Sequence, residues 1–123
     1  MAAGVAMLDT LADGRAYARI DGLAGHLENG LHAAIRRAEV GASVTRMGSM
    51  VTLFFRPEPP TNYAEARESD TAAFGRFHRA MLNRGIMLPP SQFETWFVSA
   101  AHGEAEIDAT VQAAHEAMHE ARP

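Results

Sequence analysis

The residues with the clearest chemical potential lie in one stretch, residues 89–102, which reads PPSQFETWFVSAAH. It places Glu94 two positions before Trp96, the single tryptophan of the chain. The paired prolines predict a turn, and the apolar residues after Glu94 predict a short strand. Glu94 therefore stands at the mouth of a strand, a placement that suggests a functional site. The alternative is a solvated loop carboxylate, because glutamate is mostly a surface residue.

The basic and sulfur-containing residues limit which chemistry this chain can perform. Its eleven Lys-plus-Arg residues are all arginine, and it has no cysteine. A guanidinium stays protonated and is a poor nucleophile, so amine chemistry through a lysine is excluded. The absence of cysteine also excludes disulfides, thiolate metal sites and thiol catalysis.

A second motif, His115-Glu116-Ala117-Met118-His119, matches the H-E-x-x-H pattern of zinc metalloproteases. The spacing puts two imidazoles on one face of a helix, as zinc requires. However, the motif lies at the end of the chain, and the one Glu that follows, Glu120, is adjacent to His119 and does not complete the ligand set. Both imidazoles also lie off the apolar stripe of Val111, Ala114 and Met118, which is predicted to point inward, and are expected to face solvent. We therefore predict no metal site.

Two helices are expected before any strand. Residues 1–11 are rich in Ala and Met and predict a helix, which Asp13-Gly14 breaks. Residues 17–40 predict a long helix that ends at Gly41. One face of this helix carries an apolar stripe at helical spacing, formed by Ile20, Leu23, Leu27, Leu31 and Ile35.

The remainder of the chain mixes strands and helices. Residues 44–47 and 50–55 predict a hairpin that turns at Gly48-Ser49, and residues 86–88 and 96–99 predict further short strands. A helix capped by Ser69 or Asp70 is expected to run to about Asn83, and a last helix covers residues 104–121. This order predicts an α+β fold with a small, mostly antiparallel sheet of three or four strands, covered by helices.

Composition indicates a soluble globular chain of one-domain size. It has 123 residues, of which 47% are hydrophobic and 21% charged, with a net charge of −4. The acidic balance and the lack of a basic stripe argue against nucleic-acid binding. No apolar run approaches the roughly 18 residues of a membrane span, and residues 1–11 do not resemble a signal peptide. A cytoplasmic location is the default expectation.

Residues 90–102 resemble the C-terminal signature of glutamate-1-semialdehyde 2,1-aminomutases, enzymes of the class III aminotransferase group that depend on pyridoxal 5′-phosphate (PLP). Other segments agree in order and spacing, and the resemblance covers essentially the whole chain. They are residues 1–4, the RMGSM sequence at 46–50 with LFF at 53–55, and Asn62-Tyr63 with Ser69-Asp70-Thr71 and Phe74.

The resemblance implies that this chain is the C-terminal small domain of a fold-type I PLP transferase. Residues 1–14 would form a truncated helix that leads from a missing large domain, and residues 15–123 would form the small domain. The missing part would supply the lysine that forms a Schiff base with PLP, so the isolated chain is expected to bind no cofactor and to be inactive. The family also implies a homodimer and a role in making 5-aminolevulinate, the precursor of tetrapyrroles.

Within the chain, the resemblance implies that Glu94 reaches the substrate and cofactor pocket, where a carboxylate could hold an amino group. Ser91, Gln92, Gly48 and Ser49 are weaker candidates for the pocket wall, and turn formation explains them equally well. His102 is expected to cap or pack its loop. Two alternative functions stay open. The chain could belong to a class III aminotransferase with a different substrate, or it could be a non-catalytic interaction module.

Overall fold

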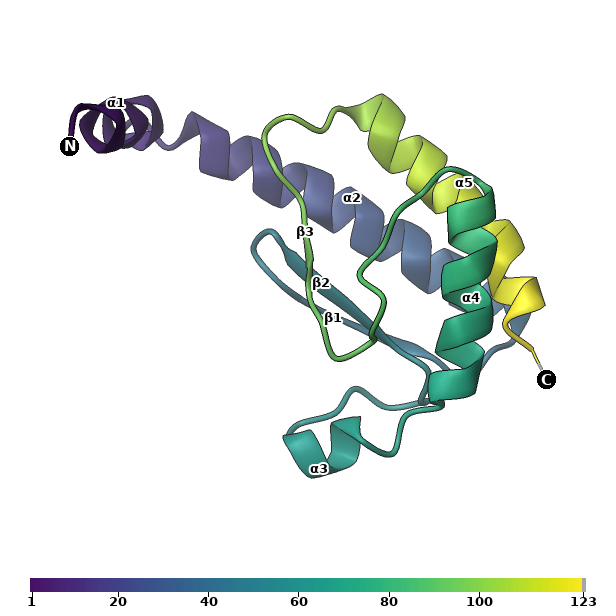
Figure 1. The fold of residues 1–123 in the computed structure, drawn as a ribbon. Helices are drawn as coiled ribbons and strands as arrows, with labels where there is room; N and C mark the ends of the chain where they lie inside the picture. The colour runs from purple at the N-terminus through teal and green to yellow at the C-terminus, as the bar shows by residue number, and fades with distance from the viewer. Residues whose placement is uncertain (123) are drawn as a thin grey trace.

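A computed structural model describes residues 1–122 and shows the predicted α+β fold with a small antiparallel sheet. The sheet has three strands, in the order β1-β2-β3. Figure 1 shows the hairpin and β3 on one side of the long helix α2, with α5 running alongside α2 and α4 next to α5. In chain order the elements are α1 (Ala2–Leu11), α2 (Arg15–Ala38), β1 (Ser43–Met47), β2 (Met50–Phe54), α3 (Tyr63–Ala66), α4 (Thr71–Asn83), β3 (Trp96–Phe97) and α5 (Glu104–Glu120).

Helix α2 contributes many of the side chains of the hydrophobic core. The stripe predicted from its sequence is buried at Leu23, Leu27, Leu31 and Ile35, and Ile20 packs partly against the same core. The helix does not end at Gly41, as predicted. It ends two residues earlier at Glu39, which adopts a left-handed conformation (φ 51°, ψ 40°) and donates its N–H to carbonyls of the last turn. Glu39 thus performs the role usually taken by glycine.

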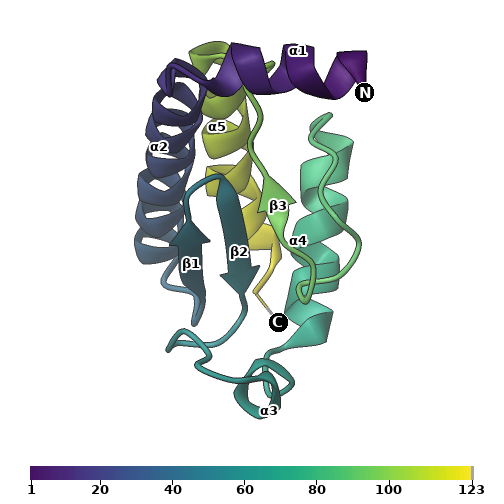
Figure 2. The ribbon, with the colours of Figure 1, turned by 90° about the vertical axis from the view of Figure 1, so that its left-hand side faces the viewer.

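The sheet buries one face, and the other face is accessible toward its hairpin end. Val44 pairs with Leu53, and Val51 with Trp96, and these four side chains are buried. The alternating residues Met47, Met50 and Phe97 lie on the opposite face and remain accessible. Figure 2 shows the sheet in front of α2 and α5, and α2 packs against β1 and β2.

Helices α2 and α5 approach each other closely at one point. A Cβ atom added to Gly30 of α2 would lie 2.3 Å from Cγ2 and 2.7 Å from Cγ1 of Val111 on α5. Val111 belongs to the face predicted to point inward, and it packs partly buried against the core beside buried Ile107, Ala114 and Met118. The contact therefore needs a residue without a side chain on α2.

Two predictions about the short elements need correction. Residues 86–88 are extended but form no strand, because they have no ladder partner among the described residues. Strand β3 covers only Trp96–Phe97 rather than residues 96–99. The single-turn helix α3 was not predicted; its N-terminus is capped by the Asn62 side chain, which accepts the Glu65 N–H.

Helix α1 stands apart from the core. It has no buried residue, and Val5, Met7 and Leu8 are exposed along it. Figures 1 and 2 show α1 crossing beyond one end of α2. The left-handed Gly14 (φ 74°) separates it from α2. Its packing against a further domain remains a prediction.

Within residues 1–122, no helix is both long enough and apolar enough to cross a membrane.

Candidate functional site

Glu94 lies in the turn before β3, as the sequence predicts. Its N–H donates to the Ser91 carbonyl at 3.1 Å, which closes the turn. Its side chain is exposed and makes no hydrogen bond or salt bridge with any described residue of the chain. The carboxylate is therefore free to meet a group from outside this domain.

Gln92 and Ser91 hold this turn in place. The Gln92 side chain is only 1% exposed, and its Oε1 accepts the N–H of Phe55, at the end of β2, at 3.3 Å. Ser91 Oγ accepts the N–H of Phe93 at 3.2 Å. The burial of Gln92 gives it the role of an anchor between the turn and the sheet, rather than that of a pocket wall.

Gly48 and Ser49 lie at the far end of β3 from Glu94. They form the hairpin turn, with Gly48 left-handed (φ 57°), and the Ser49 carbonyl accepts the Val98 N–H at 3.0 Å. Positions 94 and 98 of an extended chain are about 13 Å apart at roughly 3.3 Å per residue. The structure therefore does not bring the five candidate residues into one cluster.

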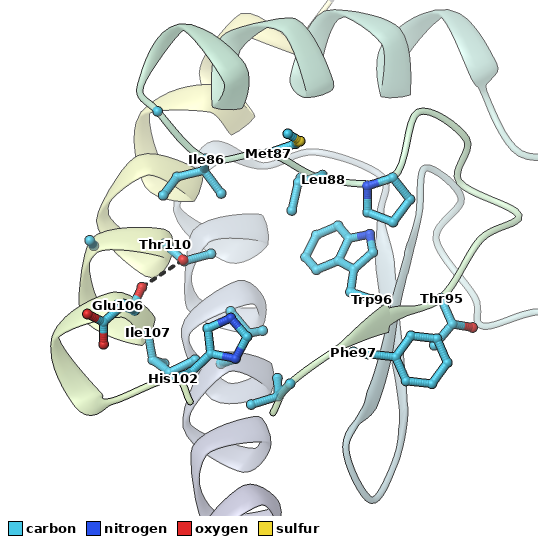
Figure 3. A pocket seen from close by; sticks show the side chains of 15 residues that line it. Ile86, Met87, Leu88, Thr95, Trp96, Phe97, His102, Glu106, Ile107 and Thr110 are labelled. Carbon is cyan, nitrogen blue, oxygen red and sulfur yellow. Dashed lines mark hydrogen bonds between the residues drawn. The ribbon is translucent and has the colours of Figure 1, made fainter. Parts of the chain in front are cut away.

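A cavity of about 500 Å³ lies on the other edge of β3, which the sequence analysis did not anticipate. Figure 3 shows Trp96 between β3 and the segment at residues 86–89, with His102, Ile107 and Thr110 on another side. The residues that line the cavity come from segments far apart in the chain, namely α2, the segment after α4, β3 and the start of α5.

His102 borders this cavity, but its ring nitrogen Nδ1 is hydrogen-bonded within its own loop. Its Nδ1 accepts the Ser99 N–H at 3.0 Å and lies 3.1 Å from Ser99 Oγ. Accepting at Nδ1 places the proton of the neutral ring on Nε2. The geometry fits the loop-capping role expected for this histidine.

Glu106 compensates for the glycine at the start of α5. The Gly103 N–H donates to Glu106 Oε2 at 2.7 Å. This hydrogen bond lowers the pKa of Glu106, and so does a further one from the backbone of Glu106 itself. The carboxylate stays charged at the helix N-terminus, where the helix dipole favours it.

The H-E-x-x-H motif lies on α5, and its two imidazoles differ in environment. His119 is exposed as expected, whereas His115 is half-buried and its Nδ1 is buried without a partner in the described part of the chain. Arg84, the residue that follows α4, forms a salt bridge with Glu116 at 2.9 Å, which lowers the pKa of Glu116. Among residues 1–122 there is no group of three or more His, Asp or Glu that could hold a metal ion.

Comparison with known proteins gives relatives over nearly the whole chain, although no family model matches it. The glutamate-1-semialdehyde 2,1-aminomutase of Thermomicrobium roseum is 48% identical over 120 residues, which cover 98% of this chain and 28% of that enzyme. The chain thus spans little more than a quarter of the length of such relatives.

Solved structures of related enzymes have the same fold over this segment. An omega-transaminase from Sphaerobacter thermophilus matches with a TM-score of 0.78 and 29% identity, covering 87% of this chain and 24% of its own. A glutamate-1-semialdehyde aminomutase from Pseudomonas aeruginosa, whose variant was also solved with PMP, matches with a TM-score of 0.77 and 25% identity over the same shares. In sequence and fold, the chain therefore matches one segment of the glutamate-1-semialdehyde 2,1-aminomutases, and the resemblance of its motifs to that family is confirmed.

Proposed function

We propose that this chain is the C-terminal domain of a glutamate-1-semialdehyde 2,1-aminomutase, which forms 5-aminolevulinate for tetrapyrrole synthesis. The observation that carries the proposal is the 48% identity to such an enzyme over 98% of the chain. The fold adds support through the TM-score of 0.77 to a second aminomutase. The parent protein is further proposed to be a cytoplasmic homodimer, as the family resemblance implies.

The residues of this chain do not suit it to hold PLP by itself. It has no lysine to form the Schiff base, and the cavity beside β3 contains no arginine that could meet a phosphate. The cofactor must therefore be held by the rest of the parent protein. Under this proposal the isolated chain is inactive.

We assign to Glu94 the role of meeting the substrate in the intact enzyme. The support is its unpaired, exposed carboxylate on a turn that Gln92 and Ser91 fix to the sheet. A fixed carboxylate attracts an ammonium group and repels a carboxylate. This preference suits an aminomutase, whose substrate carries nitrogen at neighbouring carbons in turn.

A class III aminotransferase with another substrate is the second candidate, favoured by the TM-score of 0.78 to an omega-transaminase. A non-catalytic interaction module is the third. The test is to supply the full-length parent protein with PLP and either glutamate-1-semialdehyde alone or an amine donor with a keto acid. We expect 5-aminolevulinate from the first mixture. Amino transfer only in the second mixture would favour the aminotransferase, and no reaction in either would favour the module.

A further inference from the structure

We propose that the open edge of β3 receives an extended segment from the part of the parent protein outside this chain, which pairs with β3 as an additional strand. The inference rests on the proposed function only in that the chain is one domain of a longer protein. The segment would lie in the cavity between β3 and residues 86–89, over the indole of Trp96 (Figure 3).

The first argument is the direction of the peptide groups of β3. Val98 lies opposite Ser49 and donates its N–H to the Ser49 carbonyl. Opposed residues in an antiparallel pair alternate between bonded and non-bonded, so the next pair, Met50 with Phe97, is non-bonded. The N–H and C=O of Phe97, and those of Thr95, therefore point away from β2. Among residues 1–122, neither amide N–H has a hydrogen-bond acceptor.

The second argument is the opposite wall of the cavity. Ile86 packs against the core, Met87 is 80% exposed, and Leu88 is buried. This alternation is that of a strand with one face on the core. Ile86 donates its N–H to Met81 and Leu88 accepts from His78 Nε2, so both are committed to α4. By the same alternation, the peptide groups of Met87 face the cavity.

The third argument is an unpaired donor in the cavity lining. Trp96 is 5% exposed, and its Nε1 is buried without a hydrogen-bond partner in the described residues. A buried indole N–H usually finds an acceptor. Nε1 is not open to the cavity as the indole stands, so an inserted strand would supply an acceptor only with a shift of the Trp96 side chain. Apolar side chains of that strand would pack against Leu27 and Ile107, which also line the cavity.

The chemistry of the cavity favours a polypeptide segment over a small ligand or a second copy. Alternating backbone donors and acceptors along an edge match another strand, which is how β-augmentation gains affinity. The lining has a single ionisable carboxylate, Glu106, which the Gly103 N–H already engages. A second copy would have to insert its own β3 between β3 and residues 86–89 of the first copy, although its β3 is itself paired with β2. By contrast, the relatives have nearly three quarters of their length outside the matched region.

Residue-resolved amide hydrogen exchange tests the proposal on the isolated chain and on the full-length protein. The Phe97 amide should exchange freely in the isolated chain and about 100-fold or more slowly in the full-length protein. The Val98 amide, bonded to Ser49, is the internal control and should be protected in both.

Two results would overturn the proposal. Equally fast exchange of Phe97 in both proteins, with Val98 protected, would show that the edge stays open and leave a ligand cavity as the explanation. Protection of Phe97 in the isolated chain that grows with concentration would show that a second copy fills the edge. Aminomutase assays on the same preparation keep the two proposals separate, because protection without activity would support the added strand and reject the function.

Discussion

Replacing Glu94 with glutamine in the full-length protein is expected to lower the turnover of glutamate-1-semialdehyde by about 10- to 100-fold. Glutamine keeps the shape of the side chain and removes its charge. A hydrogen bond to a charged group contributes about 1.5–3 kcal/mol, and about 1.4 kcal/mol corresponds to tenfold in rate. Steady-state kinetics would measure the loss. The expected loss rests on the exposed carboxylate, which no described residue of this chain neutralises.

The matched control is Glu58→Gln, which changes an exposed glutamate in the loop after β2. This substitution should leave turnover unchanged. Because Glu94 has no partner within its own domain, Glu94→Gln should also leave the free energy of unfolding of the isolated chain within about 0.5 kcal/mol of wild type. Wild-type turnover in the Glu94 variant would show that the carboxylate does not meet the substrate.

Replacing Gly30 with leucine is expected to destabilise the isolated chain by about 3 kcal/mol, at the upper end of the cost of overpacking. Even the first added atom would lie 2.3 Å from Val111, and the Cβ of Val111 itself is only 3.0 Å away. The two helices must therefore separate. Leucine is a better helix former than glycine by nearly 1 kcal/mol, which offsets only part of this cost. Urea unfolding would measure the change.

Gly22→Leu provides the control on the same helix, because a Cβ there would meet nothing within 4 Å. This variant should be stabilised by up to about 1 kcal/mol through helix propensity alone. Adding Val111→Ala to Gly30→Leu should recover part of the lost stability, since it removes two of the crowded atoms. If Gly30→Leu unfolds at the same urea concentration as wild type, α2 and α5 do not pack as described.

Much of the fold follows from local signals in the sequence. The stripe on α2 reflects a 3.6-residue period that only a helix satisfies, and Gly48-Ser49 between two alternating runs specifies a hairpin. Asp70 caps α4 through a hydrogen bond from the Ala73 N–H, as its position before the helix predicts. Such features depend on neighbours in sequence and are therefore readable from it.

The remaining features depend on residues far apart in the chain. Residues 86–88 have the pattern of a strand, but whether they pair depends on what lies beside them. Gln92 reads as a turn residue, and only the position of Phe55 makes it a buried anchor. Glu39 ends α2 in a left-handed conformation that glycine usually adopts. The prediction that the helix ends at the nearby Gly41 was therefore wrong. The cavity brings together four separate segments, which no local pattern encodes.

These observations change the meaning of the motif at residues 89–102. Gln92 and Ser91 fix the turn, Trp96 and Val98 fill the core, and Glu94 projects from the domain with no partner of its own. The motif thus fits a fixed wall that presents one carboxylate to a site completed elsewhere. The chain has no lysine, so under the proposed function the Schiff base would form in another part of the parent protein.

The most direct test of this account compares 5-aminolevulinate formation by the isolated chain and by the full-length protein, in one assay with PLP and glutamate-1-semialdehyde. We predict formation by the full-length protein and none by the isolated chain. Product formation by the isolated chain, or its absence with a folded, PLP-loaded full-length protein, would contradict the account.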